Sequence, residues 1–267
     1  MLTRFAPAPT GYLHLGHVVN ALFIWGLADL HGGRVILRIE DHDRQRSRPQ
    51  FEAAIFEDLE WLGFVPHIIA PRQSDREDAY RLQLQMLSAR GLVYACDCTR
   101  KEVGGPRYPG TCRDRGLPLT DDVGWRVRVG HGVEFFRDLF LGPQQQEPES
   151  QCGDILIRDR HGNWTYQWAA TVDDYLQQID YVIRGVDLLD STGRQLRLAW
   201  LLGRRHPIHF GHHPLVMKTP TQKLSKSDKD TAIRDLRAAG WSREGVLEEA
   251  KRRVDVTGML GRFGSVR

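Results

Sequence analysis

The chain has 267 residues, of which 41% are hydrophobic, so it can bury a full core without disulfide or metal staples. Its formal net charge is only +3, so any contact with nucleic acid must come from a local cationic face rather than from the overall balance. No apolar run approaches the length of a membrane span, and no basic-then-apolar leader opens the sequence. We expect a globular cytoplasmic protein without membrane contact, and a monomer by default.

Residues 4–17 predict a buried strand end, a rigid turn and the start of a helix. Two prolines favour extended backbone, Gly11 permits a tight turn, and residues 18–29 are apolar at helical spacing. The start of a helix carries unpaired backbone N–H groups and the positive end of the helix dipole, which together can bind an anion. His14 and His17 would add donors on the same face.

The next segments alternate between strand and helix patterns. Residues 34–41 form a nearly continuous apolar run that ends in acidic residues, which is typical of a parallel strand buried on both faces. Further strands are expected over residues 155–157 and 181–184, and helices over 50–62, 192–202 and 74–91, the last opened by a capping box of Ser74 and Glu77. This alternation predicts an α/β fold with a doubly wound parallel sheet, which binds ligands at the carboxyl ends of its strands.

Three of the four cysteines lie within seventeen residues, at positions 96, 98 and 112. Reduced thiolates at Cys96, Cys98 and Cys112 would supply three of the four tetrahedral ligands of Zn²⁺, so we favour a structural zinc site over simple reduced cysteines or disulfides. Water or Asp97 is available as a fourth ligand. Cys152 lies outside this loop and is expected to be a core residue.

The cysteine-rich loop and short alternating strands such as residues 125–129 interrupt the α/β pattern, and residues 142–150 read as an exposed polar loop. We therefore expect four units, with two short helices in the last: the first half of the sheet domain (1–93), an inserted zinc-binding subdomain (94–150), the second half of the sheet domain (151–230) and a helical C-terminal segment (231–267).

A second candidate phosphate-binding element, Lys223-Leu224-Ser225-Lys226-Ser227, follows the two histidines by more than two hundred residues. Alone, this element is typical of a solvated charged loop, and His14-Leu15-Gly16-His17 alone is typical of a capped helix. As a pair, HLGH and KLSKS resemble the HIGH and KMSKS signatures of class I aminoacyl-tRNA synthetases. The surrounding RFAPAPTGYLHLGH resembles the glutamate-specific branch of that family.

The resemblance implies a Rossmann-like class I synthetase domain that works in two steps. Glutamate would attack the α-phosphorus of ATP, pyrophosphate would leave, and the acyl adenylate would react with a hydroxyl on nucleic acid. Mg²⁺ would accompany ATP. The implied catalytic residues are His14, His17 and Lys226, and the implied ATP-binding residues are His14, Gly16, His17, Lys223 and Lys226.

An acidic amino acid has one ammonium and two carboxylates, so its site needs a fixed acid and more than one cation. Arg4, Glu40 and Arg184 each lie at the expected carboxyl end of a strand, and arginine can bind a carboxylate through two parallel hydrogen bonds. The resemblance implies that glutamate is bound by Arg4, Phe5, Ala6, Pro7, Ala8, Glu40, Tyr166 and Arg184. Ala8 stands where the family usually has serine, so backbone groups would replace that hydroxyl.

Full-length glutamyl-tRNA synthetases resemble this chain to about residue 230 and then continue into a domain that grips the anticodon. Only residues 228–267 follow KLSKS here. The shortened glutamyl-queuosine tRNA(Asp) synthetases, which glutamylate a base within the anticodon loop, resemble the chain more fully through Asp187-Leu188 and through Tyr108 four residues before Cys112. This resemblance implies zinc ligands at Cys96, Cys98, Tyr108 and Cys112, although Tyr108 would merely pack if water or Asp97 completed the site.

Three functions are compatible with these sequence features. The favoured one is an ATP-dependent ligase that places L-glutamate on queuosine of tRNA(Asp). The second is a truncated or discriminating glutamyl-tRNA synthetase that charges the terminal ribose. The third is an inactive, zinc-stabilised RNA-binding protein with a synthetase fold, and the presence of both histidines and both motif lysines argues against it.

Overall fold

The computed structural model describes residues 1–219, 222–223 and 231–264. Its larger sheet has seven strands in the order β3-β2-β1-β9-β10-β6-β7, and all neighbours pair in parallel except β6 and β7. The predicted α/β fold is therefore confirmed, although the sheet is mostly parallel rather than wholly so. These strands are β1 (Leu2–Phe5), β2 (Arg34–Leu37), β3 (Ile68–Ile69), β6 (Glu134–Asp138), β7 (Gly142–Gln146), β9 (Tyr181–Gly185) and β10 (His209–His213).

The early helices form where the sequence predicts them. α1 (Leu15–Leu30) begins directly after His14, and α2 (Pro49–Leu62) has a proline at its first turn. Gly63 ends α2 with φ +77°, a left-handed conformation that glycine adopts without strain. The other helices of the sheet domain are α3 (Glu77–Ser88), α6 (Tyr166–Leu176) and α7 (Thr192–Leu201), with 3-10 turns η1 (Gln73–Asp75) and η2 (Val186–Ser191).

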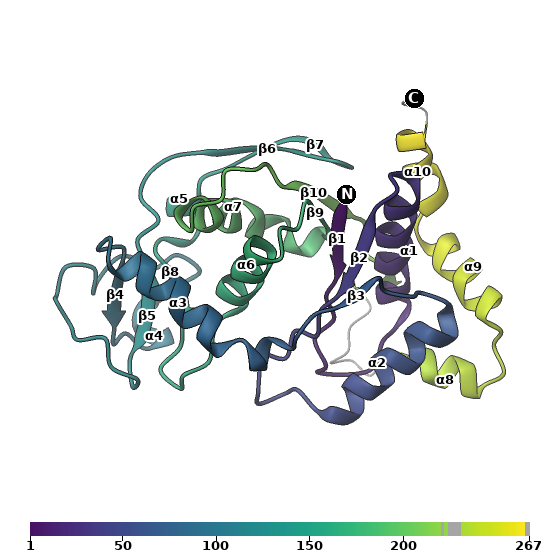
Figure 1. The fold of residues 1–267 in the computed structure, drawn as a ribbon, viewed down its shortest axis with the longest axis horizontal. Coiled ribbons are helices and arrows are strands. Elements are labelled where there is room, and N and C mark those ends of the chain that lie inside the picture. Colours follow the sequence, from purple (N-terminus) through teal and green to yellow (C-terminus); the bar gives the residue numbers. More distant parts are fainter. Residues whose placement is uncertain (220–221, 224–230, 265–267) are drawn as a thin grey trace.

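A second, antiparallel sheet of three strands lies at one end of the molecule (Figure 1). It comprises β4 (Val93–Cys96), β5 (Gly124–Val127) and β8 (Ile155–Arg158), with the short helices α4 (Arg100–Val103) and α5 (Pro148–Cys152). β11 (Met217–Thr219) pairs antiparallel with β12 (Gln222–Lys223). The C-terminal helices lie at the opposite end of the molecule.

Two predictions, one for a strand and one for a loop, are wrong. Residues 155–157 do not resume the parallel sheet, because β8 pairs antiparallel with β5. Residues 142–150 are not an exposed loop, because they form β7 and most of α5. β7 is polar because it is an edge strand whose residues alternate between partly buried and exposed. The expected unit boundaries stay a prediction, but strands β6 and β7 from residues 94–150 belong to the larger sheet.

The expected capping box at the start of the 74–91 helix is also wrong. α3 begins at Glu77, and its N-cap Arg76 makes no side-chain capping hydrogen bond. The Ser74 hydroxyl and amide instead donate to the Asp41 carboxylate at 2.6 and 2.8 Å, and the Glu77 carboxylate accepts from the Trp164 indole at 2.7 Å. Tertiary partners thus replace the local cap.

The C-terminal segment contains three helices rather than the expected two: α8 (Ile233–Ala238), α9 (Arg243–Arg253) and α10 (Val256–Gly264). Their buried residues Ile233, Val246 and Val256 belong to the same core cluster as Phe23 and Leu27 of α1. These helices therefore complete the core beside α1. No helix in the described ranges is long and apolar enough to cross a membrane.

Asp58 of α2 is a buried acid whose Oδ2 has no hydrogen-bond partner. Burial raises its pKa from 3.8 to about 6, against the opposing attraction of Arg237 and Arg234 on α8. A raised folded-state pKa means that the stabilising contribution is present below pH 3.8 and is lost as the pH rises through about 6.

We therefore expect Asp58→Asn to increase the free energy of unfolding by about 2 kcal/mol at pH 8 and by much less at pH 4.5. Urea denaturation at both pH values measures this difference. Glu60→Gln, an exposed change on the same helix, is the matched control. A gain in the Asp58→Asn variant that is equal at the two pH values contradicts the titration argument.

Candidate active site

The start of α1 holds the two predicted histidines side by side. The amide of Gly16 donates to His14 Nδ1 at 3.1 Å, and the amide of His14 donates to His17 Nδ1 at 3.1 Å. Both Nδ1 atoms are acceptors, so each neutral ring carries its proton on Nε2. The ring centroids are 4.1 Å apart. The predicted helix start is confirmed, and it combines two imidazole Nε2–H donors with the helix dipole.

The chain that follows the KLSKS motif lies close to these histidines. Ala232 forms an isolated antiparallel bridge with His14, and the amide of Ile233 donates to the Leu13 carbonyl at 2.8 Å. Of the predicted ATP-binding lysines, Lys223 lies in β12, and Lys226 lies outside the described residues. The segment that follows the motif thus returns to the helix start.

Residues 4–8, the first half of the 4–17 segment, run beside the residues that follow β2. The amide of Arg38 donates to the Phe5 carbonyl at 3.0 Å, and the amide of Glu40 donates to the Pro7 carbonyl at 3.1 Å. Ala8 accepts from the amide of Thr10 at 2.9 Å in the turn. Residues 4–8 and Glu40 are thereby brought together at the carboxyl end of the sheet, as predicted.

Arg4 and Glu40 are joined by two residues that the sequence did not single out for this site. Arg38, which is fully buried, donates to Glu40 at 2.8 Å and to Asp174 at 2.8 Å, while Arg4 Nε donates to Asp174 at 3.2 Å. Burial opposes the charge on Arg38, but Asp174, Glu40 and Asp173 outweigh it and raise the Arg38 pKa. The neighbouring arginines likewise lower the Asp174 pKa despite its burial. The hydrogen bond from Arg38 therefore fixes the position of the Glu40 side chain.

Arg184 is the buried cation of the site. Its guanidinium donates to Gln195 at 2.7 Å, to Thr192 at 2.9 Å and to the Tyr166 hydroxyl at 3.4 Å, all of them neutral partners. Among the described residues it forms no ion pair with a carboxylate, and burial lowers its pKa. A buried arginine without an acid partner is costly unless a ligand supplies the negative charge.

Two further residues, His212 and Asp138, fix the orientation of Arg184. Arg184 Nε donates to His212 Nε2 at 3.0 Å, so the imidazole proton sits on Nδ1, which donates to Asp138 Oδ2 at 2.5 Å. Asp138 Oδ1 accepts from three backbone amides, those of residues 140, 141 and 212. Burial lowers the pKa of His212. Burial opposes the charge on Asp138, but the hydrogen bonds from His212 and the backbone lower the Asp138 pKa.

The sequence did contain a signal for these missed residues. Asp173 and Asp174 are adjacent acids in a helix whose other buried residues are mainly apolar, and each is buried. His212 and Asp138 lie at the carboxyl ends of β10 and β6, where ligand sites of parallel sheets form. An acid or histidine at such an end is a site candidate even without a recognised motif.

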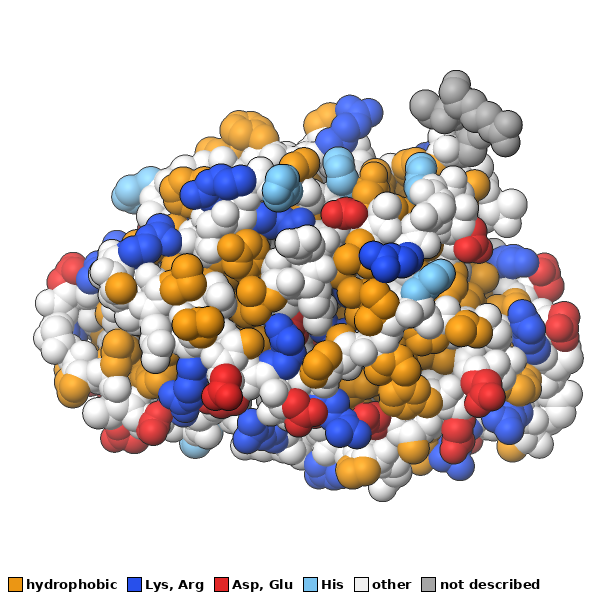
Figure 2. Space-filling model, viewed as in Figure 1, with side chains coloured by type: hydrophobic (Ala, Val, Ile, Leu, Met, Phe, Trp, Pro, Cys, Tyr) orange, Lys and Arg blue, Asp and Glu red, His pale blue; other side chains and the backbone are white. Residues whose placement is uncertain are grey.

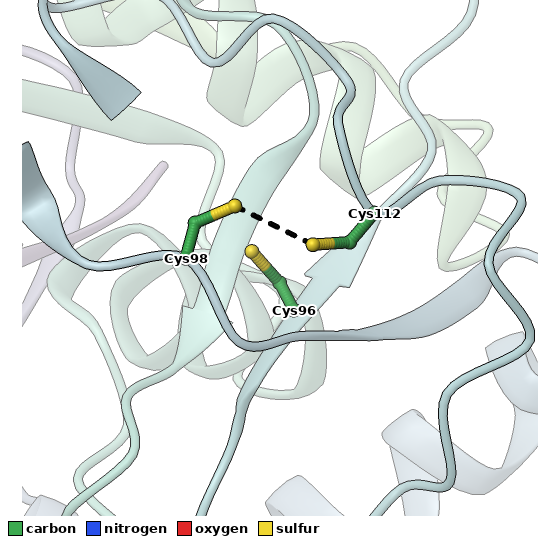
Figure 3. A group of neighbouring side chains, drawn as sticks. All are labelled: Cys96, Cys98 and Cys112. Atoms are coloured by element: carbon green, nitrogen blue, oxygen red, sulfur yellow. Dashed lines mark hydrogen bonds between the residues drawn. The ribbon is translucent and has the colours of Figure 1, made fainter. Parts of the chain in front are cut away.

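The three predicted metal-binding cysteines converge at the end of β4 (Figure 3). Their sulfur atoms all lie within 4.8 Å of one another, and Cys98 Sγ is 3.4 Å from Cys112 Sγ. The Tyr108 hydroxyl is buried, lies 3.4 Å from Cys96 Sγ and accepts from the amide of Cys112 at 2.8 Å. These groups have the chemistry and spacing of a metal site.

Asp97 and Cys152, the other residues considered for this region, differ in position. Asp97 Oδ1 is 3.2 Å from Cys112 Sγ, but it is exposed and is also bound by Arg115 at 2.7 Å. Cys152 is buried in the core of the smaller sheet, as predicted, and does not belong to the cluster.

The family described as tRNA synthetases class I (E and Q), catalytic domain, matches residues 1–111 and 125–258. Proteins named Glutamyl-Q tRNA(Asp) synthetase from Acinetobacter baylyi and Cupriavidus metallidurans are 42% and 41% identical to the chain. These matches cover 86% and 89% of this chain and 78% and 82% of the relatives.

Longer proteins are similar to the chain over part of their length. A protein named Glutamate--tRNA ligase 2 from Syntrophus aciditrophicus is 37% identical over 91% of this chain, which spans 55% of that relative. The solved glutamate tRNA ligase of Elizabethkingia meningosepticum, in complex with its amino acid, superposes with a TM-score of 0.79 at 26% identity, over 97% of this chain and 64% of that one. The family match spans most of the chain, and the two named Glutamyl-Q tRNA(Asp) synthetases exceed 30% identity. The chain therefore belongs to the family of catalytic domains of class I tRNA synthetases for glutamate (E) and glutamine (Q).

Proposed function

We propose that this protein is an ATP-dependent ligase that activates L-glutamate as its adenylate and transfers it to queuosine in the anticodon of tRNA(Asp). The observation that carries the choice of an acidic amino acid is Arg184, a buried cation that lacks a carboxylate partner among the described residues. The choice of acceptor rests on the shared name of the similar proteins.

In the amino-acid site, Arg184 binds one glutamate carboxylate and Tyr166 lies beside it. Glu40, held in position by its hydrogen bond from Arg38, attracts the ammonium, and Arg4, which donates to Asp174, adds positive charge to the site. Backbone groups of Phe5, Ala6, Pro7 and Ala8 line the substrate. This arrangement fixes the α-carboxylate for attack, which is a contribution of positioning rather than of covalent chemistry.

In the nucleotide site, the Nε2–H groups of His14 and His17 and the positive end of the α1 dipole, where Gly16 lies, are directed at the ATP phosphates. Lys223 and Lys226 of the KLSKS motif add positive charge, and Mg²⁺ accompanies the nucleotide. In the first step the glutamate oxygen bonds to the α-phosphorus and pyrophosphate leaves. In the second step an acceptor hydroxyl attacks the glutamyl carbonyl and AMP leaves.

The acceptor is tested by incubating the protein with radiolabelled glutamate, ATP and tRNA(Asp) with or without queuosine. We expect label only on the queuosine-containing tRNA, and we expect removal of the 3′-terminal adenosine to leave that labelling unchanged. Labelling that is equal on both tRNAs and lost with the terminal adenosine would instead identify a ligase that charges the terminal ribose. An absence of glutamate-dependent pyrophosphate exchange would identify a protein without adenylation activity.

We also propose that Cys96, Cys98, Cys112 and Tyr108 hold one structural Zn²⁺. Sulfur ligands about 2.3 Å from a tetrahedral zinc lie close to 4 Å from one another. The sulfur atoms of Cys96, Cys98 and Cys112, all within 4.8 Å of one another, suit this spacing. The buried Tyr108 hydroxyl is better placed for the fourth position than Asp97, which is exposed and already paired.

We expect Cys98→Ser to lower bound zinc from one equivalent to less than about 0.2, because two thiols and a phenol hold the ion weakly. Atomic absorption of the purified protein measures the metal, and glutamate-dependent pyrophosphate exchange should fall by less than about fivefold because the ion lies outside the amino-acid site. Cys152→Ser is the matched control, since this cysteine lies outside the cluster. A wild-type protein without zinc removes the premise.

A further inference from the structure

A cavity of about 770 Å³ lies between the metal-binding cluster and the amino-acid site. Cys96, Cys98 and Arg126 line it on one side, and His42 and Thr165 line it on the other. Thr165 directly precedes Tyr166, whose ring centroid is 6.1 Å from that of His42 and whose hydroxyl contacts Arg184 at 3.4 Å. The cavity therefore lies beside Tyr166 and Arg184, the proposed binding site of the glutamate carboxylate.

The charges that line this cavity favour an anionic ligand. Arg100, Arg126 and Arg160 line it, and none of the three forms an ion pair with a carboxylate in the described parts of the chain. The lining acids Asp43 and Asp159 already have partners: Asp43 pairs with Arg46 at 2.6 Å, and Asp159 accepts from its own loop. Arg126 lies against Cys96 and the Tyr108 ring, so the positive charge of Arg100 and Arg160 remains for the ligand.

The face in view in Figure 2 is not comparably biased toward positive charge. Figure 2 shows Lys and Arg interspersed with Asp and Glu over the face in view, in keeping with the net charge of +3. An RNA ligand must therefore find its positive charge locally. The cavity walls also carry amides and ring systems, namely Gln45, Asn163, His161 and Trp164, which suit the polar edge and the flat face of a nucleobase.

His42 presents a hydrogen-bond acceptor to this cavity. Gln73 Nε2 donates to Asp173 at 2.9 Å, so Gln73 Oε1 faces His42 Nδ1 at 2.7 Å and must accept from it. Asp173 is fixed in turn by Arg76 at 2.6 Å and Tyr80 at 2.9 Å. The proton of His42 therefore sits on Nδ1, and the lone pair on Nε2 is available to a hydroxyl donor.

We propose that the cavity takes the acceptor nucleoside of the RNA substrate, with its flanking phosphate beside Arg100 and with the hydroxyl that receives glutamate donating to His42 Nε2. This inference rests on the proposed function and assigns the acceptor a place in it. The nucleoside would enter between the smaller sheet and the segments that carry His42 and Thr165, so the metal-binding cluster would support one wall of its site.

The test separates the first step from the second with three variants. His42→Phe keeps a ring but removes the acceptor, and His42→Gln restores an amide donor for Gln73 and an oxygen acceptor for the cavity. Arg100→Ala removes a cation that is exposed and unpaired in the described structure, and Arg205→Ala is its matched control outside the cavity. Pyrophosphate exchange without RNA reports the first step, and transfer of radiolabelled glutamate to queuosine-containing tRNA(Asp) reports the second.

We expect His42→Phe to lower the rate of transfer about tenfold while exchange changes by less than about twofold, and His42→Gln to recover most of the loss. Arg100→Ala should weaken tRNA binding about fivefold and reduce the slope of log K against log salt by about one, whereas Arg205→Ala should do neither.

Several results overturn the inference. Transfer that is unchanged in His42→Phe and Arg100→Ala, with an active wild type, removes it while leaving the proposed function intact. An equal loss of exchange and transfer in His42→Phe assigns the residue to the first step. Equal weakening of tRNA binding in Arg100→Ala and Arg205→Ala would show that tRNA is bound by charge spread over the surface rather than by this cavity. A wild type that exchanges pyrophosphate but never labels queuosine removes the proposed function and this inference together.

Discussion

Arg184→Gln is expected to lower kcat/KM for glutamate by about 10²- to 10³-fold in pyrophosphate exchange, with KM for ATP nearly unchanged. Glutamine keeps a donor for His212 but removes the buried positive charge, and losing one member of a buried charge pair with substrate costs about 3–4 kcal/mol. Steady-state kinetics at varied glutamate, then at varied ATP, measures the two effects separately.

The control for this prediction is Arg205→Gln, which removes an exposed guanidinium that donates to the backbone of Trp200 and of Arg204. It should change neither parameter. A similar loss for both substrates in Arg184→Gln would indicate a general disturbance of the fold, and an unchanged KM for glutamate would mean that Arg184 does not bind the carboxylate.

Asp138→Asn is expected to lower kcat/KM for glutamate by about 10²-fold, although Asp138 contacts no substrate in our assignment. Three backbone amides hold one oxygen of Asp138, so the amide NH₂ of the new asparagine must face His212 Nδ1. The imidazole proton then moves to Nε2 and opposes the Arg184 Nε–H. Such a loss of the correct tautomer leaves the geometry nearly intact but removes the support of the arginine.

Nitrogen-15 NMR of the histidine side chains distinguishes this role from a merely structural one. We expect the His212 proton on Nδ1 in the wild type and on Nε2 in the Asp138→Asn variant, together with a raised KM for glutamate. Wild-type kinetics in a variant with the altered tautomer would show that His212 does not position Arg184. An unaltered tautomer with reduced activity would assign the loss to packing.

The sequence predicted those elements whose signals are local. Proline at the start of α2, glycine at its end and apolar spacing in α1 each act within a few residues, and the structure has both helices there. The same reasoning placed Arg4 and Arg184 at strand ends that meet, because parallel strands bring their carboxyl ends to one edge.

Pairings that join distant segments were not predictable from the same signals. The short apolar run of β8 is compatible with a strand of either sheet. Only its antiparallel pairing with β5 shows that it belongs to the smaller one. His212 and Asp138 lie 74 residues apart in the sequence, and Asp174 lies 170 residues from Arg4. No periodicity relates such positions, so the residues that hold Arg184 and Glu40 in place became visible only in the folded chain.

The order of the larger sheet also constrains how the protein can be made. β1 lies between β2 and β9, and Thr3 pairs with Tyr181. On the ribosome, a nascent chain shorter than about 180 residues has the HLGH helix but lacks the strand that carries Arg184. The three strands of the smaller sheet end at residue 158 and are all made earlier. The ability to bind glutamate is therefore among the last properties that the chain acquires during its synthesis.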